Sequence, residues 1–259
     1  MLVDSHCHLD FPDFAEELDA VVERARAAGV ARMVTISTRV RRFEQVRAVA
    51  ARYDEIYCSI GTHPHNAADE TDVGADELVA IAADDKVVAI GETGLDFFYD
   101  KSPRDLQAAA FRVHIEAARR TGLPLVIHSR DADSETADIL ADETGKGAFP
   151  MLLHCFSSGP ELAKRAVALG AYVSLSGIIT FKKTDALRAI VADLPAERLL
   201  VETDAPYLAP VPHRGKRNEP AYVADTAAAL AAIHGAEPAA MAATTTENFF
   251  RLFSKVPRP

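Results

Sequence analysis

Seven of the nine histidines in this 259-residue chain stand at or just after the end of a short apolar run. They are His6, His8, His63, His65, His128, His154 and His213. In α/β folds, the side chains that follow a strand lie at the edge where catalytic and metal-binding groups collect. Imidazole binds metals and exchanges protons near neutral pH. The placement of the histidines therefore predicts one shared site for metal or acid–base chemistry.

The first apolar run carries a His-x-His pair. Because side chains alternate along a strand, His6 and His8 share one face and Cys7 takes the other. Two imidazoles on an inward face could bind one metal ion. A lone pair of this kind is also compatible with two polar residues that merely end a strand. We interpret Cys7 as a small buried residue and not as a ligand.

Carboxylates follow two further apolar runs. Glu92 stands between Gly91 and Thr93 at the end of one run, and a second glycine, Gly94, follows. Glu202 and Asp204 come directly after another run, and alternation places them on the same side. The spacing alone does not decide which of these two acids is a metal ligand. For each segment, a solvated acid in a turn is the alternative.

Two more apolar runs, at 126–128 and 152–154, each end in a histidine. With these residues the candidate ligands become four imidazoles and two carboxylates, listed as His6, His8, Glu92, His128, His154 and Asp204. This mixture suits Zn, Mn, Ni, Co or Fe, and the lack of thiolates argues against a structural zinc cage. Six such coincidences predict a metal site.

These residues need elements that bring them to one edge. Strand-like runs are found at 2–5, 32–36, 56–60, 87–90, 123–127, 150–153, 171–175 and 198–201. Segments with helical periodicity follow at 16–28, 41–53, 76–83, 104–121, 135–144, 161–169, 185–192 and 221–234. Glycines at 29, 122, 145 and 170 are expected to end four of these helices.

Eight strand–helix units predict an α/β fold, a single-domain (β/α)8 TIM barrel over residues 1–259, with an extra C-terminal helix at 238–253. A doubly wound open sheet is the rival architecture. It is disfavoured because no G-x-G-x-x-G turn follows the first strand.

The net charge of −10 argues against a protein that coats nucleic acid through a broad basic surface. It does not exclude a nuclease, because bound divalent cations reverse the local sign of charge. Three scattered cysteines without a C-x-x-C pair indicate reduced thiols. No apolar run is long enough to cross a membrane, and we expect a cytoplasmic protein with no membrane association and no obligate protein partner.

Eight motifs together resemble the TatD family of metal-dependent hydrolases, from the first strand to the last. They are DSHCHLD at 4–10, GTHPH at 61–65, GETGLDFFYD at 91–100, HSRDA at 128–132, HCFSSG at 154–159, SLSG at 174–177, ETDAPYLAP at 202–210 and PHRGKRNEP at 212–220. None of the motif positions departs from the family pattern.

The resemblance implies a ligand assignment. His6, His8 and Asp204 would hold one metal, His128 and His154 the other, and Glu92 would bridge both. It also implies two divalent cations per subunit, with Zn, Mn, Ni, Co, Fe and Mg all left open. The implied activity is hydrolysis of DNA phosphodiester bonds, usually as an exonuclease, by water activated between two metals.

Three residues are predicted to act in catalysis. Asp204 would both hold a metal and accept a proton from water, and Glu92 would act through its bridging position. His63, from a separate loop, would orient a phosphate oxygen or protonate the leaving group. His65 is the weaker candidate for substrate contact, and its alternative is a loop histidine held by Pro64.

Basic residues near the same edge are candidate contacts for an anionic substrate, namely DNA or another nucleic acid. They are Arg130, Arg214, Lys216 and Arg217, with Lys182 and Lys183 more typical of a solvated helix start. The aromatic run 97–99 could stack on bases or could instead cover the barrel edge.

Two other function classes fit the same site. A metal amidohydrolase or aminoacyl-ester hydrolase would use the metals to polarise a carbonyl group, but the basic rim has no clear use against a neutral amide. A non-catalytic metal or nucleic-acid binding scaffold is the second alternative. The intact set of Asp204 and His63 argues against it, because binding alone does not require them.

Overall fold

Eight parallel strands form one sheet in which each strand pairs with the next along the chain. We describe a computed structural model of residues 1–259. The strands are β1 (Leu2–Cys7), β2 (Val30–Thr35), β3 (Ile56–Ile60), β4 (Val87–Asp96), β5 (Leu125–Arg130), β6 (Met151–Leu153), β7 (Tyr172–Leu175) and β8 (Leu199–Val201). Almost all of their residues are buried, as expected for parallel strands covered on both faces.

Helices alternate with the strands. They are α1 (Leu18–Ala27), α2 (Phe43–Arg52), α3 (Ala75–Ile81), α4 (Arg104–Thr121), α5 (Asp133–Lys146), α6 (Pro160–Ala168), α7 (Asp185–Ala192), α8 (Val223–Ile233) and α9 (Pro238–Leu252). Short 3-10 helices lie at Pro12–Phe14, Val40–Arg42, Pro64–Asn66, Gly177–Thr180, Ala196–Arg198 and Pro220–Tyr222. None of the helices combines the length and the apolar character that a bilayer span requires. The predicted (β/α)8 barrel with an additional C-terminal helix is confirmed.

One predicted helix end is wrong. Gly145 was expected to end α5, but the helix continues to Lys146 and Gly147, with φ of 155°, follows it. Gly147 leaves the helix in a conformation that favours glycine, whereas Gly145 keeps a negative φ. The prediction at Gly122 is confirmed, because this residue ends α4 in the left-handed conformation.

Barrel closure depends on the segment after β8 and not on β8 itself. The seam between the first and last strands is a single parallel bridge between Cys7 and Ala205. Two backbone hydrogen bonds flank it, from Asp204 N to His6 O at 2.9 Å and from His8 N to Ala205 O at 2.8 Å. Closure therefore ties Asp204 directly to the His-x-His strand.

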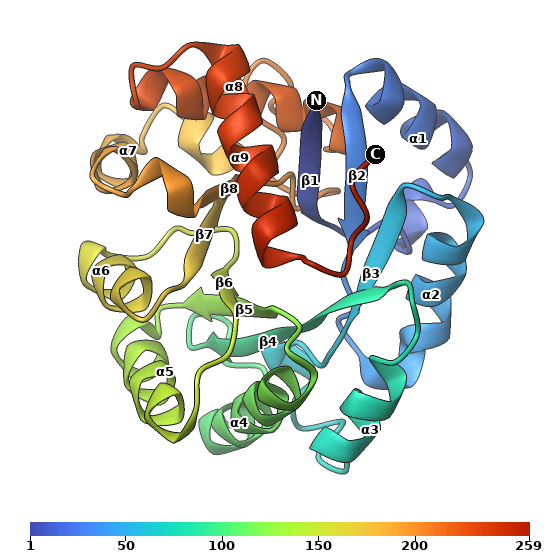
Figure 1. Cartoon of the computed structure of the whole chain (residues 1–259), viewed down its shortest axis with the longest axis vertical. Helices are drawn as coiled ribbons and strands as arrows, with labels where there is room; N and C mark the ends of the chain where they lie inside the picture. The colour runs from blue at the N-terminus through green and yellow to red at the C-terminus, as the bar shows by residue number, and fades with distance from the viewer.

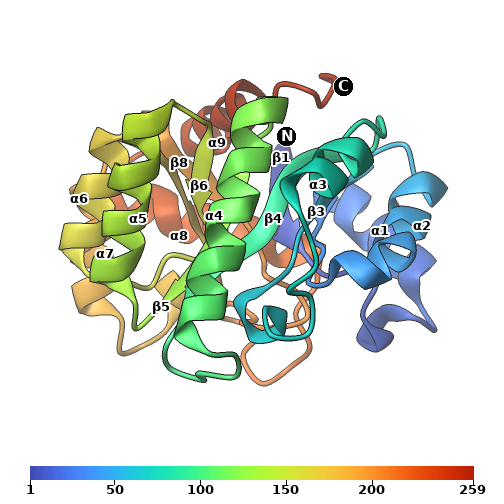
Figure 2. The same cartoon turned by 90° about the horizontal axis from the view of Figure 1, so that it is seen from below.

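The barrel has an apolar end and a polar end. Strand residues such as Val3, Val88 and Leu200 pack inside it against α9, and Phe249 of α9 and Phe253, which follows the helix, belong to the same cluster. Figure 1 shows α9 lying across this end within the ring of helices. Figure 2 shows both termini and α9 on one side of the molecule, and the long loops that follow β4 and β8 on the opposite side. The candidate site lies on that opposite side.

Candidate metal centre

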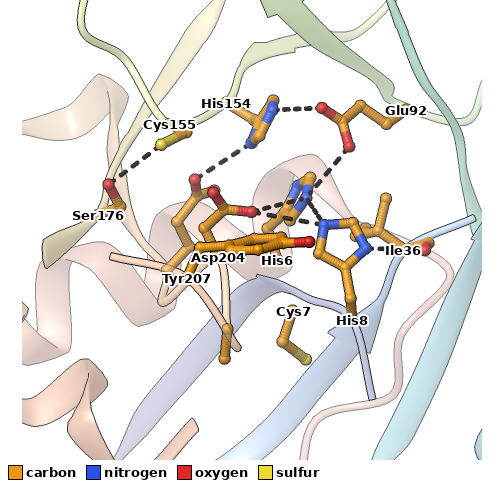
Figure 3. A network of polar contacts seen from close by, with 12 residues as sticks. His6, Cys7, His8, Ile36, Glu92, His154, Cys155, Ser176, Asp204 and Tyr207 are labelled. Atoms are coloured by element: carbon orange, nitrogen blue, oxygen red, sulfur yellow. Dashed lines mark hydrogen bonds and ion pairs between the residues drawn. The ribbon is translucent and has the colours of Figure 1, made fainter. Parts of the chain in front are cut away.

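Six side chains from five strands or strand ends converge at the polar end of the barrel, several of them visible in Figure 3. They are the predicted set His6, His8, Glu92, His128, His154 and Asp204. Four are buried, while His128 and Asp204 are partly exposed at their side chains (19% and 15%). The site is therefore a largely desolvated pocket that remains open to the loops.

An irregularity in β1 aims its two histidines. Val3 packs inside the barrel with α9, whereas Cys7 packs in the outer cluster beneath the helices. Strict alternation would put these two residues on the same face, but the register against β2 shifts between Asp4 and Cys7. Because of this shift, the alternation of inward and outward side chains is reversed after Asp4, and His6 and His8 both point toward the candidate site. Cys7 is buried and donates its thiol to Val34 O, away from the candidate ligands.

A second irregularity aims Glu92. The pairing of β4 with β5 shifts between Ile90 and Thr93, which lets Glu92 leave the regular ladder. Glycine is required beside it, since a Cβ on Gly91 would lie 2.6 Å from Val126 O and one on Gly94 would lie 2.0 Å from His128 O. The strands thus approach closely enough to bring Glu92 against His128.

The donors near β1 form the first cluster. His6 Nε2 lies 3.3 Å from His8 Nε2, 3.5 Å from Glu92 Oε2 and 3.6 Å from Asp204 Oδ1. His8 Nε2 lies 3.4 Å from the same Asp204 oxygen. Ligands bound tetrahedrally at about 2.1 Å from an ion are separated by roughly 3.4 Å. These four separations are close to that value, and His6, His8 and Glu92 each offer a donor atom within 4.8 Å of the other two.

The donors near β5 and β6 form the second cluster. Glu92 Oε1 lies 2.7 Å from His154 Nε2, 3.1 Å from His128 Nδ1 and 3.4 Å from His63 Nε2. One carboxylate oxygen of Glu92 thus belongs to each cluster. This is the geometry expected of a carboxylate that bridges two cations.

The chemistry of the buried groups fits divalent cations. His154 Nε2 is buried without a hydrogen bond of acceptable geometry, despite its short distance to Glu92. Burial disfavours protonated His154, yet the carboxylates of Glu92 and Glu202 raise its pKa well above the usual value. Burial opposes the charge of Glu92, but His154 and His63 lower its pKa well below the usual range. A cation attracted by these carboxylates would replace the proton on the imidazole.

The two acids after β8 lie in different places. Asp204, with φ of 56°, turns its Oδ1 toward His6 and His8. Glu202 is fully buried, accepts a hydrogen bond from Ser174 and lies 3.3 Å from His154 Nδ1, the ring nitrogen that faces away from Glu92. Glu202 also offers a carboxylate oxygen within 4.8 Å of His6 and His154, but its position at Nδ1 of His154 suits a carboxylate that orients this ring, whereas Asp204 contacts both histidines of β1.

Asp96 is a residue of this site that the sequence did not single out. Its Oδ2 lies 2.7 Å from His65 Nε2 and 3.2 Å from His128 Nε2. Its Oδ1 accepts the backbone N–H groups of Phe98 and Tyr99 at 3.1 and 2.8 Å. The sequence signal that could have identified Asp96 is its position as a second acid four residues after Glu92. Asp96 holds the ring of His128 so that Nδ1 faces the cluster, and it also engages His65.

His63 lies beside the second cluster and can donate a hydrogen bond toward it. Its Nδ1 accepts the backbone N–H of His65 at 3.1 Å, so that neutral His63 carries its proton on Nε2. Burial lowers the pKa of His63 well below the usual value and favours this neutral form. Nε2–H therefore points toward Glu92 and the space between the clusters.

The basic side chains lie farther out. Arg130 packs over the rings of Phe98 and Tyr99, and Arg214 packs over Phe181 with its guanidinium carbon 3.7 Å from the ring centroid. Lys216 is exposed, and its side chain has no hydrogen bond or ion pair within the chain.

Two predicted rim residues have partners of their own. The guanidinium of Arg217 donates to Asp13 O and to the carboxylates of Glu17 and Glu219. His213 stacks on Tyr222 and pairs with Asp225 at the start of α8. No hydrogen bond or ion pair joins His213 to the candidate ligands, although it shares their position after a strand.

Comparisons with known proteins agree with this geometry. A family model described as TatD related DNase matches residues 3–254. The metal-dependent hydrolase YcfH of Escherichia coli strain K12 is 42% identical over 257 residues, which cover 97% of this chain and 95% of that protein. A 3'-5' ssDNA/RNA exonuclease, TatD of Cronobacter sakazakii, is 37% identical over 254 residues and 95% of each chain.

Among solved structures, that of YjjV, a TatD homologue from Escherichia coli K12, superposes with a TM-score of 0.91 at 32% identity, covering 99% of this chain and 98% of that one. The barrel, its bridged donor clusters and these relatives lead to one conclusion: this chain belongs to the TatD family of metal-dependent hydrolases.

Proposed function

We propose that this protein hydrolyses phosphodiester bonds of DNA as an exonuclease that depends on two divalent cations. The observation that carries the proposal is the position of Glu92, with one carboxylate oxygen in each of two donor clusters. The relative named as a 3'-5' ssDNA/RNA exonuclease supports the choice of substrate. The identity of the cations stays open among Zn, Mn, Ni, Co, Fe and Mg.

In this proposal His6, His8 and Asp204 would hold one cation, His128 and His154 would hold the other, and Glu92 would be a ligand to both. Two such cations would activate water and neutralise charge on the phosphate in an in-line displacement. Glu202 and Asp96 keep His154 and His128 in the orientation that this arrangement needs, through the ring nitrogens that face away from the clusters.

Two residues are proposed to move or direct protons. Asp204 would accept a proton from the attacking water, because its carboxylate is partly exposed and is ionised: the neighbouring His8 and His6 lower its pKa against the effect of burial. His63 directs Nε2–H toward a phosphate oxygen or the leaving oxygen, and the His65 amide maintains that tautomer.

Five residues outside the clusters are proposed contacts for the phosphate backbone, namely Arg130, His65, Arg214, Lys216 and Arg217. Arg214 and Lys216 are exposed and available to it. The contribution of Arg217 stays a prediction, since its guanidinium is engaged by Glu17 and Glu219.

The test is product analysis with end-labelled DNA and RNA in the presence of each metal and of a chelator. We expect metal-dependent release of terminal nucleotides from the DNA. Amide and aminoacyl-ester substrates are assayed in parallel. Turnover of those substrates without any cleavage of phosphodiesters would replace this proposal with the amidohydrolase alternative.

A further inference from the structure

Exposed aromatic side chains border the metal centre. The large hydrophobic residues with the most exposure are Met1, Phe98, Tyr99, Tyr207 and Val211. All except Met1 lie on loops at the polar end of the barrel, after β4 or β8. These aromatic rings leave about half of their surface in water, and a group of such rings at a binding site indicates a ligand with an apolar face.

The first group, here called the Phe98 surface, consists of Phe98, Tyr99 and Arg130. Phe98 and Tyr99 are 54% and 53% exposed, and the guanidinium carbon of Arg130 lies 4.0 and 4.8 Å from their ring centroids. Asp96 holds the backbone of both aromatics and also contacts His128. The backbone that carries the two rings is therefore tied to the second donor cluster.

The Phe98 surface opens onto a polar cavity of about 570 Å³ between the loops that follow β5 and β6. Phe98 and Arg130 line it together with serine hydroxyls and with the acidic residues Asp131, Asp133 and Glu135, so that a base fits this cavity better than a phosphate does. A flat, partly polar group stacked on the aromatic rings would have space and hydrogen-bonding partners there.

The second group, the Tyr207 surface, consists of Phe11 and Tyr207. Tyr207 is 54% exposed, and its ring centroid lies 6.3 Å from that of Phe11. Phe11 stacks on His8 at 4.6 Å, and Tyr207 N donates to Asp204 O at 2.9 Å. Asn218 also donates to Tyr207 O, which fixes this turn. Figure 3 shows Tyr207 in the same group of residues as Asp204 and His8.

The two surfaces lie on either side of the metal centre, each next to a different donor cluster. The Tyr207 surface adjoins His8 and Asp204, which share the first cluster with Glu92 Oε2. The Phe98 surface adjoins His65 and His128 on the side of Glu92 Oε1. A phosphodiester between the clusters would direct its two nucleosides toward different surfaces.

We propose that these surfaces stack the two unpaired nucleobases on either side of the scissile phosphodiester, one base on each surface. This inference rests on the proposed function. Stacking on an aromatic ring stabilises a base without reading its identity, and Arg130 adds positive charge beside the phosphate backbone. Bases paired in a duplex would have to separate before both could stack.

The test uses the metal-loaded protein and the dinucleotide TpT, with two analogues in which one base or the other is replaced by hydrogen. Loss of the matching base should lower kcat/KM of the wild type by roughly 5- to 100-fold. Phe98→Ala should produce a similar loss with TpT but little further loss when the base that it stacks is already missing. Tyr207→Ala should show the same pattern with the other analogue.

Matched variants test whether loss of stacking is the cause of the lower kcat/KM. Phe98→Tyr and Tyr207→Phe retain the rings and should retain most of the activity. Tyr53→Ala removes a tyrosine that follows α2, near the start of β3 at the other end of the barrel, and should leave all three substrates unaffected. If base removal costs the same factor in the wild type and in both alanine variants, the stacking surfaces are refuted. If the wild type cleaves neither TpT nor longer DNA with any metal, the proposed function itself fails.

Discussion

The two ends of the barrel use the same strands for opposite purposes. At one end, inward-facing Val3, Val88 and Leu200 pack against Phe249 of α9 and against Phe253, which follows it, and exclude water. At the other end, inward-facing positions carry imidazoles and carboxylates whose charges depend on one another. Aromatic residues divide in the same way, buried in α9 and exposed around the metal centre.

This contrast indicates that packing at the apolar end stabilises the fold, whereas the buried ionisable groups at the polar end serve function and lower its stability. Buried polar groups are costly unless they are paired or bound to a metal. The packing of α9 against the apolar end stabilises the barrel and so offsets the cost of burying many ionisable groups at its polar end. Each of the following changes tests one part of this contrast against a matched control.

The largest effect on stability is expected from Phe249→Ala. Phe249 is 1% exposed and stacks on Phe253 with ring centroids 4.5 Å apart. Removing its ring should lower the free energy of unfolding by about 3–5 kcal/mol, measured by denaturant titration. The folded fraction should keep its kcat. The exposed counterpart, Phe98→Ala, should change stability by less than about 0.5 kcal/mol. Equal losses in the two variants would contradict the division between the ends.

An effect of about 3 kcal/mol is expected from the pH dependence of His114. This residue of α4 is buried, and its Nε2 accepts the N–H of Thr62 beside the His63 loop. Burial lowers its pKa from 6.5 to about 4. The folded state therefore binds a proton less readily than the unfolded state. Its contribution to stability is fully present above pH 6.5 and is lost as the pH falls toward 4.

We expect the unfolding free energy of the wild type to fall more steeply between pH 6.5 and 4 than that of His114→Gln, with a difference that approaches about 3 kcal/mol. Denaturant titrations at several pH values measure it. The comparison between wild type and variant cancels the titration of the other histidines. Parallel pH profiles would show that His114 is not the group responsible.

A change of about 10²-fold in kcat is expected from Asp204→Asn. The amide keeps the shape and one oxygen but loses charge and the ability to accept a proton. Nucleic acid should still bind, and added metal should not restore the rate. Turnover, metal content and binding are measured on the same preparation.

Glu202→Gln is the matched control, since Glu202 lies only two residues away but contacts His154 from outside the clusters. A smaller loss of activity is expected from it than from Asp204→Asn. If Glu202→Gln abolishes turnover while Asp204→Asn leaves it intact, the roles of the two acids are reversed.

The smallest effect is expected from Arg214→Ala, because Arg214 is exposed and acts through charge on flexible substrate. KM for DNA should rise by roughly 2- to 5-fold, and the slope of binding against salt should fall by about 1. Metal content and unfolding should not change. Arg217→Ala provides the comparison, since its partners predict a loss of loop stability as well. Wild-type KM and salt response in Arg214→Ala would exclude it from substrate binding.

The sequence by itself determined the barrel and the kind of residues at its active end. Hydrophobic periodicity is a local property, and it located β3, α4 and α7 with the bounds found in the structure. The recurrence of histidine after apolar runs needs only the order of residues along the chain. In a parallel barrel, every strand end meets at the same mouth, so sequence order alone predicts which side chains gather.

Only the tertiary structure decided how these side chains meet. The phase of His6 and His8 depends on a register shift against β2, and the direction of Glu92 depends on one against β5. Asp204 and Glu202 look equivalent by alternation, but the closing seam turns Asp204 inward. Such shifts arise from contacts between strands far apart in sequence, which a local pattern does not contain. The same reason explains why the support from Asp96 to His128 was visible only in the fold.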